Sequence, residues 1–440
     1  MSIFEILKSK LRAGTGRDII KVFSFRIGGI FFNYLAMYLV INWGNIRAWG
    51  WINLVISAIN ILGIIPLFGL HTLILKRFPI HTVENNRLEI WRILQIVILL
   101  SFITILFLLP FKDIFVSKVF KTNENISFEI FLAFLILIPI FNINKIILSV
   151  FRTNNQISYF GIFNRNNIFY FLLSIVSAFS ILFFREIETR TVLMMLLVIP
   201  CSIMIPGLYL SLKKLNAFKL EFFLRKRNDN SRSIYLLKES MPLVLSSSLM
   251  VIMGWSDTFL IGVFMTPEDV GYYNIIFKIS SVATIFLSVV NAVVTPKLSL
   301  LYHQDKLKLE RFVKKSNRNI FLFTSIVLIL IIFLSEDILN LFSSEVLFLK
   351  KPLLVLIAGY FINAYCGTIG YLLQMTGYAK IFQKIVAWAT ILNIGLNILL
   401  IPKYGLLGAA LSGTISMSLW NLIGLYVVNK KIQINTIFYK

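Results

Sequence analysis

The feature that most limits how this chain can fold is a series of long apolar stretches. Twelve segments of about 20 mostly apolar residues follow one another, which is the length a helix needs to cross the hydrocarbon of a bilayer. Lipid offers no hydrogen-bond partners to the backbone, so each segment is predicted to be a helix. The predicted spans are residues 22–41, 50–75, 91–111, 128–150, 159–184, 191–212, 240–265, 271–294, 320–342, 352–375, 381–401 and 406–428.

The basic residues are distributed unevenly among the connections between the predicted spans. The chain has 43 Lys and Arg against 20 Asp and Glu, a net charge of +23, which in a soluble protein would suggest nucleic acid. When residues near span edges are counted with the connection they flank, 31 of the basic residues fall in the N-terminal arm, the even-numbered connections and the C-terminus, nine in the odd-numbered connections and three within spans. Lys and Arg concentrate on the cytoplasmic side, so both termini are predicted to be cytoplasmic and the charge indicates orientation rather than nucleic-acid binding.

The chain divides near its midpoint. The longest basic connection follows the sixth span, which predicts an N-terminal six-helix lobe (1–212), a basic cytoplasmic linker (213–238) and a C-terminal six-helix lobe (239–440). The halves also resemble each other, as in Gly50-Trp-Ile-Asn53 and Gly271-Tyr-Tyr-Asn274 at the starts of equivalent spans. An even number of spans in each half predicts parallel repeats.

The predicted fold is therefore an all-α polytopic membrane protein, with twelve transmembrane helices in two parallel six-helix lobes around a central cavity. This layout suits alternating access. The alternative is two packed bundles with no transport role, because repeats alone do not define function. We find no phosphate-binding loop, no cysteine framework and no histidine spacing typical of a metal site, so we predict no cofactor.

Four ionisable residues inside predicted spans are candidates for a functional site. They are Arg26, Lys145, Asp257 and Lys278, and such residues are costly enough in lipid to indicate a functional site. Asp257 and Lys278 lie at similar depth, about 10–12 Å below the turn that joins spans seven and eight, so they are candidates to pair. The excess of cations suits a phosphate-bearing substrate. The alternatives are snorkelling of Arg26 and Lys145 to the interface and a purely structural Asp257–Lys278 pair.

Buried amides form a second polar group. Asn393 and Asn397 lie four residues apart on one face of span eleven. In bilayers such groups mostly join helices, so we favour a structural role for them.

Several motifs resemble one family. The segment beginning Glu239-Ser-Met-Pro242, then Gly254-Trp-Ser-Asp257, Asn393-Ile-Gly-Leu-Asn397 and Ile401-Pro-Lys-Tyr-Gly405 are similar to those of polysaccharide transport proteins. The chain thus resembles the O-antigen and exopolysaccharide flippases of the multidrug/oligosaccharidyl-lipid/polysaccharide exporter superfamily.

The resemblance implies a transporter, not an enzyme. It would flip an undecaprenyl-diphosphate-linked oligosaccharide across the bacterial plasma (inner) membrane, alongside a polysaccharide polymerase and glycosyltransferases of the same pathway. Basic residues of the cavity would hold the diphosphate, and Asp257 would serve ion coupling or gating. The implied substrate-binding residues are Arg26, Lys278, Lys145 and Arg152.

Two rival functions remain. A cation-coupled multidrug exporter of the same fold is expected to carry an acidic residue in span one, where this chain has Arg26 and no Asp or Glu between Asp18 and Glu84. A membrane enzyme such as a polysaccharide polymerase is expected to carry a large outward loop, and the longest predicted outward loops are under about 20 residues.

Overall fold

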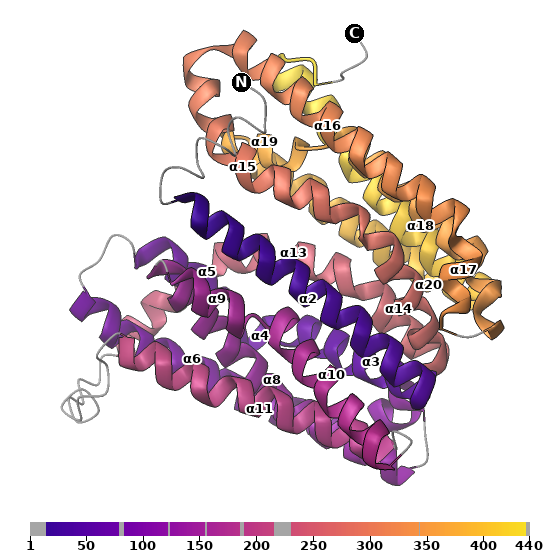
Figure 1. The fold of residues 1–440 in the computed structure, drawn as a ribbon. Coiled ribbons are helices and arrows are strands. Elements are labelled where there is room, and N and C mark those ends of the chain that lie inside the picture. Colours follow the sequence, from indigo (N-terminus) through magenta and orange to yellow (C-terminus); the bar gives the residue numbers. More distant parts are fainter. Residues whose placement is uncertain are drawn as a thin grey trace. The chain divides into compact units, whose positions relative to one another are not determined.

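The structure is a computed structural model of the 440-residue chain. It describes residues 15–78, 83–121, 124–154, 156–184, 189–214, 230–342 and 344–436. Within these ranges all regular elements are helical (Figure 1). The chain forms two compact units, Met1–Val251 and Ile252–Lys440.

Unit 1 is a bundle of long apolar helices with short helical turns between them. Its elements are α2 (Thr15–Trp43), α3 (Ile46–Leu62), α4 (Ile64–Leu67), α5 (Leu70–Arg77), α6 (Val83–Leu108), η1 (Leu109–Phe111), α7 (Lys112–Ile114), η2 (Phe115–Phe120), α8 (Glu124–Thr153), α9 (Ile157–Phe163), α10 (Arg165–Phe184), α11 (Thr189–Lys214) and the first part of α13 (Asn230–Phe264). Most of the predicted linker 213–238 lies outside the described residues.

Unit 2 contains the rest of α13 and a second bundle. Its other elements are α14 (Pro267–Ser281), α15 (Ala283–Gln304), α16 (Lys306–Phe333), α17 (Ser335–Asn340), η3 (Ser344–Leu349), α18 (Lys350–Cys366), α19 (Ile369–Met375), α20 (Ala379–Val427) and η4 (Val428–Ile432). Helices α15, α16, α18 and α20 lie side by side (Figure 1). The boundary between the units falls inside α13, later than the predicted start of the second lobe at residue 239.

Within the described ranges, eight helices are long and apolar enough to cross a membrane, and ten if each of two bent pairs counts as one span. Two elements account for the difference from the predicted twelve. Helix α10 qualifies only as a shorter apolar helix. Helix α20 is counted once, although 49 residues would extend about 74 Å against a hydrocarbon core of about 30 Å. Its backbone breaks at Gly405 (φ 57°, ψ −133°), which divides it into two legs. Twelve spans stay a prediction.

The two bent spans hold equivalent places in the halves of the chain. In unit 1, α3 and the segment 64–77 meet at an angle of 40°, and in unit 2, α14 and the start of α15 meet at 50°. These are the second span of each predicted half. The bends are therefore consistent with the predicted repeat, and helices interrupted at corresponding positions are typical of transporters built from repeats.

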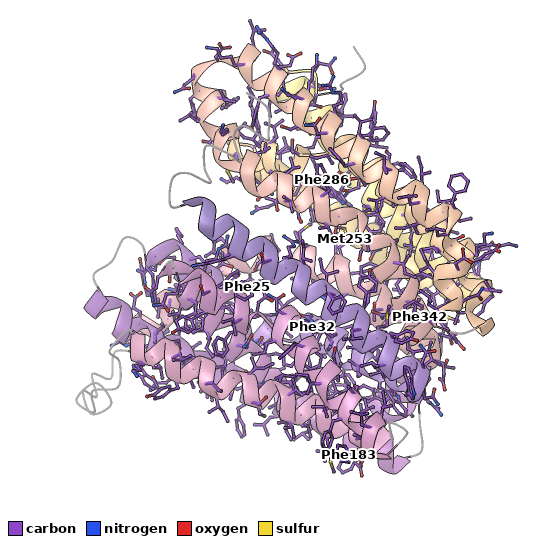
Figure 2. The ribbon with its side chains drawn as sticks, in the orientation of Figure 1. Phe25, Phe32, Phe183, Met253, Phe286 and Phe342 are labelled. Atoms are coloured by element: carbon purple, nitrogen blue, oxygen red, sulfur yellow. The ribbon has the colours of Figure 1, made fainter. Side chains whose placement is uncertain are left out.

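Aromatic residues pack α2 into unit 1. Phe25 and Phe32 lie along α2 (Figure 2), two helical turns apart and hence on one face. Phe32 packs edge-on against Phe171 of α10, with ring centroids 4.7 Å apart. Phe25 lies so close to Gly161 of α9 that a Cβ there would meet its ring. The apolar face of α2 is thus buried against α9 and α10.

In unit 2, a turn between α18 and α19 rests on one buried amide. Gly367 (φ 67°, ψ −120°) and Thr368 (φ −84°, ψ 13°) have the dihedral angles of a type II′ turn, which favours glycine at its first central position. The Asn317 Oδ1 atom accepts hydrogen bonds from the Thr368 N–H and hydroxyl, both at 3.1 Å. Its Nδ2 donates to the carbonyls of Cys366 and Thr436. Asn317 therefore ties α16 to this turn and to the C-terminal segment.

Replacing Gly367 by alanine is expected to destabilise unit 2. A Cβ there would lie 2.7 Å from Asn317 Cγ, so strain of about 1–3 kcal/mol adds to overpacking of similar size. Gly377→Ala is the matched control, because that glycine also has positive φ (89°) but a Cβ would meet nothing within 4 Å. Thermal unfolding in detergent should show a larger loss for Gly367→Ala. Equal losses would contradict the role given to Asn317.

Candidate functional site

Unit 2 contains a buried carboxylate that contacts two neighbouring helices. Asp257 of α13 is 7% exposed. Its Oδ2 accepts a hydrogen bond from the Tyr273 hydroxyl of α14 at 3.0 Å. Its Oδ1 accepts from the Nδ2 atoms of Asn393 and Asn397 of α20, at 3.0 Å and 2.6 Å. All three donors are neutral. Hydrogen bonds from two helices, α14 and α20, therefore converge on one carboxyl group of a third helix, α13.

A second set of hydrogen bonds holds the amides in place. The Ser256 hydroxyl donates to Asn393 Oδ1 at 2.5 Å, and Asn397 Nδ2 is 3.3 Å from the same oxygen. The side chains of Ser256, Tyr273, Asn393 and Asn397 are all buried. One acceptor, Asn397 Oδ1, is buried without a hydrogen-bond partner. An unsatisfied oxygen next to a buried carboxylate is a position where a cation or a water molecule would be stabilised.

The local sequence explains this geometry. Asn393 and Asn397 are four residues apart, so both amides lie on one face of the first leg of α20. The break at Gly405 lets the second leg turn back, and Gly413 then lies against Asp257. A Cβ at Gly413 would be 2.8 Å from Asp257 Oδ2. Glycine at this position is therefore what allows the second leg to approach the carboxylate.

Burial restricts what this site can do. A lone ionised carboxylate is costly in a low-dielectric interior, and neutral donors offset only part of that cost. The group is stabilised by taking up either a proton or a small cation. Carboxylate, amide and hydroxyl oxygens are ligands that hard cations prefer. Asp257, Asn393, Asn397 and Ser256 supply such oxygens within one cluster.

The predicted substrate-binding residues are divided between the units. In unit 1, Arg26 is an exposed residue of α2, and α8 carries half-buried Lys145 and, in its last turn, exposed Arg152. Lys145 and Arg152 are seven residues apart, so they lie on the same face of α8. In unit 2, Lys278 is half-buried in the last turn of α14. The structure thus aligns two of these cations on one helix.

Lys278, the predicted ion-pair partner of Asp257, lies on the same helix as Tyr273. Tyr273 and Lys278 are five residues apart on α14, which turns their side chains about 140° away from each other around the helix axis. The face of α14 that meets Asp257 is the face of Tyr273. The Asp257–Lys278 pair stays a prediction.

Sequence reasoning missed three members of the site. Tyr273, Ser256 and Gly413 are not singled out there, although Ser256 lies in a motif that carries the family resemblance and Tyr273 in one that carries the internal repeat. Asn393 and Asn397 were interpreted as structural, and they do join α20 to α13. They do so through Asp257 itself, which makes them part of the same site.

The fold matches membrane transporters of one superfamily. An inward-facing multidrug resistance MATE family transporter of the MOP superfamily superposes with a TM-score of 0.73 at 15% identity, covering 92% of this chain and 94% of that one. The lipid II flippase MurJ in an inward closed conformation gives 0.67 at 16% identity, over 92% and 87%. Together with the apolar helices, these likenesses define a multi-pass membrane protein with the fold of MOP superfamily transporters.

Two family models match parts of the chain. A model described as polysaccharide biosynthesis protein matches residues 21–301, and a model described as MatE matches residues 242–399. The first match covers more than half of the chain. The chain therefore belongs to the polysaccharide biosynthesis protein family.

Curated relatives include named flippases. A probable low-salt glycan biosynthesis flippase of Haloferax volcanii is 23% identical over 207 residues, 47% of this chain and 43% of that protein. A probable flippase of the same organism is 25% identical over 183 residues, 41% and 38% of the two chains. A membrane protein of Methanocaldococcus jannaschii is 29% identical over 233 residues, 50% and 54%. The matches span about half the length of these relatives. Flippases are transporters rather than enzymes, so these relatives agree with the prediction that the chain is not an enzyme.

Proposed function

We propose that this protein flips a polyprenyl-diphosphate-linked oligosaccharide across the plasma membrane by alternating access. The observation that carries the proposal is the match of residues 21–301 to the polysaccharide biosynthesis family, joined with the named flippases among the relatives. Flipping requires no bond to be made or broken, so the chain's task is to bind, shield and release its cargo. Undecaprenyl diphosphate is the carrier that we propose.

Four basic residues are proposed to hold the cargo. A diphosphate carries negative charge that must be compensated away from water, and Arg and Lys bind phosphate well. The proposed binding residues are Arg26, Lys278, Lys145 and Arg152. Alternating access further requires the predicted arrangement of two six-helix lobes around a central cavity, with both termini cytoplasmic. A bacterial inner membrane and a pathway with glycosyltransferases and a polymerase complete the proposal.

Asp257 is proposed to couple transport to a cation. Its support is the geometry: one buried carboxylate, amide and hydroxyl oxygens around it, and the unpartnered Asn397 Oδ1. Binding or release of a proton or a small cation there would change the charge of a site on which α13, α14 and α20 converge. A charge change at such a point can shift the packing of those helices.

The second candidate is a cation-coupled multidrug exporter, favoured by the MatE match over residues 242–399. Arg26 in the first span argues against it, because a cationic drug would be repelled by an arginine. The third candidate, a membrane enzyme, lacks support because the named relatives are flippases.

Reconstitution tests the proposal. The purified chain in liposomes is expected to move a fluorescent undecaprenyl-diphosphate-linked oligosaccharide between leaflets, measured as the fraction that a membrane-impermeant quencher reaches over time. Liposomes without protein provide the baseline. Efflux of a cationic dye without movement of the glycolipid would favour the exporter instead.

A further inference from the structure

One arginine of unit 1 joins three helices. Arg77, the last residue of α5, has its Nη1 2.9 Å from Glu89 Oε1 on α6. Its Nε is 3.2 Å from Glu239 Oε2 on α13. The same guanidinium lies over the ring of Tyr235, 5.3 Å from the centroid, and Lys76 Nζ is 3.3 Å from Glu239 Oε1. We call these five residues the Arg77 cluster.

Burial indicates that the inner part of the cluster stays closed. The side chains of Glu89, Arg77 and Glu239 are 2%, 14% and 22% exposed. Separating such a pair leaves a buried charge without compensation, which is far more costly than losing a surface pair. Lys76 is 58% exposed, so its contribution is small. The Arg77 contacts are thus a permanent attachment rather than a pair that opens easily.

A second contact fixes the same part of α13. Gly69, the residue before α5, has φ 70°, and a Cβ there would lie 2.9 Å from the Val244 backbone nitrogen and 3.0 Å from the Ser240 carbonyl oxygen. The backbone of α13 therefore touches the beginning of α5, while Glu239 is bound at its end. Residues 235–244 of α13 are held from both ends of α5.

The held segment and the carboxylate site are parts of one helix. Helix α13 extends from Asn230 to Phe264 with Pro242 inside it, and Asp257 lies 13 residues beyond Val244. The unit boundary falls between these two points, after Val251. The held segment and Asp257 are therefore joined through the helical residues that follow Pro242.

We propose that Arg77 is a positioning residue that clamps residues 235–244 of α13 to α5 and α6 throughout the transport cycle, and that transport depends on this attachment. The inference rests on the proposed transport function. Arg77 suits the task because its planar guanidinium can bind two carboxylates through different nitrogens, which a lysine cannot do in the same geometry.

A cross-linking experiment tests the clamp. The pair Lys76→Cys and Glu239→Cys is made in a Cys201→Ala, Cys366→Ala background whose transport has been checked. Flipping of the fluorescent undecaprenyl-diphosphate oligosaccharide is expected to fall about tenfold, within the 5- to 150-fold range usual for coupling between sites. A short thiol-specific cross-linker should restore it, because the covalent bridge replaces the ion pair. Lys76→Cys alone should transport about as fast as the Cys201→Ala, Cys366→Ala parent protein.

Two results would overturn the clamp. One is full transport by the uncross-linked double-cysteine protein. The other is a cross-linked protein that is folded but stays inactive, which would mean that the contact must open during the cycle.

A second measurement does not depend on the cargo. In Arg77→Gln with Glu89→Gln, both members of the buried pair are neutral, so the chain avoids a lone buried charge. Hydrogen exchange in lipid nanodiscs should then be faster in residues 233–244 and unchanged in 252–264. Unchanged exchange in both segments would refute the clamp. If the wild-type protein flips no glycolipid, the proposed function fails while this exchange result still decides the clamp.

Discussion

Asp257→Asn should reduce flipping of the lipid-linked oligosaccharide to the level of empty liposomes while the protein remains folded. Asparagine keeps the shape of the side chain and an oxygen that can accept from Asn393 and Asn397, and its amide can donate to the Tyr273 hydroxyl. What it loses is the charge that binds a proton or a cation. The network therefore survives, and the proposed coupling does not.

The matched control is Asp337→Asn, the same change at an exposed carboxylate of α17, which should leave transport unchanged.

Replacing choline by Na⁺ at constant ionic strength should raise the unfolding temperature of the wild type but not of Asp257→Asn if the coupling ion is sodium. A proton-coupled protein would show no such shift, and its transport would instead follow a pH gradient. Wild-type transport by Asp257→Asn would remove the residue from the mechanism.

Gly413→Ala gives an independent view of the same site. The added methyl would lie 2.8 Å from Asp257 Oδ2, so the carboxylate must move. Transport should fall although every polar atom of the site is retained.

Lys278→Ala should abolish glycolipid flipping at normal expression. A charged hydrogen bond to phosphate contributes about 1.5–3 kcal/mol, so its loss weakens binding of the diphosphate by roughly 10- to 150-fold. Lys278 is half-buried in the last turn of α14, inside the bent span of unit 2. At that place water cannot replace the missing charge as easily as it would on the surface.

Two further substitutions serve as controls for Lys278→Ala. Lys278→Arg keeps the charge and should retain much of the activity, and Lys380→Ala removes an exposed lysine and should have little effect. Normal transport by Lys278→Ala together with a lower unfolding temperature would assign Lys278 to a structural ion pair with Asp257 instead. Arg26→Ala, measured in the same assay, extends the test to unit 1.

Much of the fold follows from local sequence. Each predicted span falls largely on helical residues, and some lie wholly within one helix, as with residues 128–150 inside α8 and 191–212 inside α11. The bends in the spans cannot be predicted in this way. Counting apolar residues does not reveal that Phe68 adopts φ 40° or that the helix ends at Gly63. Those angles depend on how α3 to α5 pack against their neighbours.

The site was predicted only in part. Asp257 stands out in the sequence because a carboxylate in an apolar segment is rare. The sequence does not identify its hydrogen-bond partners, since Asn393 and Asn397 are 136 and 140 residues away. Charges of the Arg77 cluster were counted as loop charges, and nothing in the spacing of Lys76 and Glu239, 163 residues apart, indicates that they meet.

The sequence by itself determined that this chain is a bundle of membrane helices, and it indicated an orientation for them. Both conclusions rest on quantities that add up along the chain: apolar length and the position of basic residues. Only the tertiary structure decided that Asp257 is held by neutral donors from α14 and α20, and that Arg77 joins α5, α6 and α13. The reason is that a hydrogen bond or an ion pair requires two groups within about 3–4 Å, and packing between distant helices alone sets that distance.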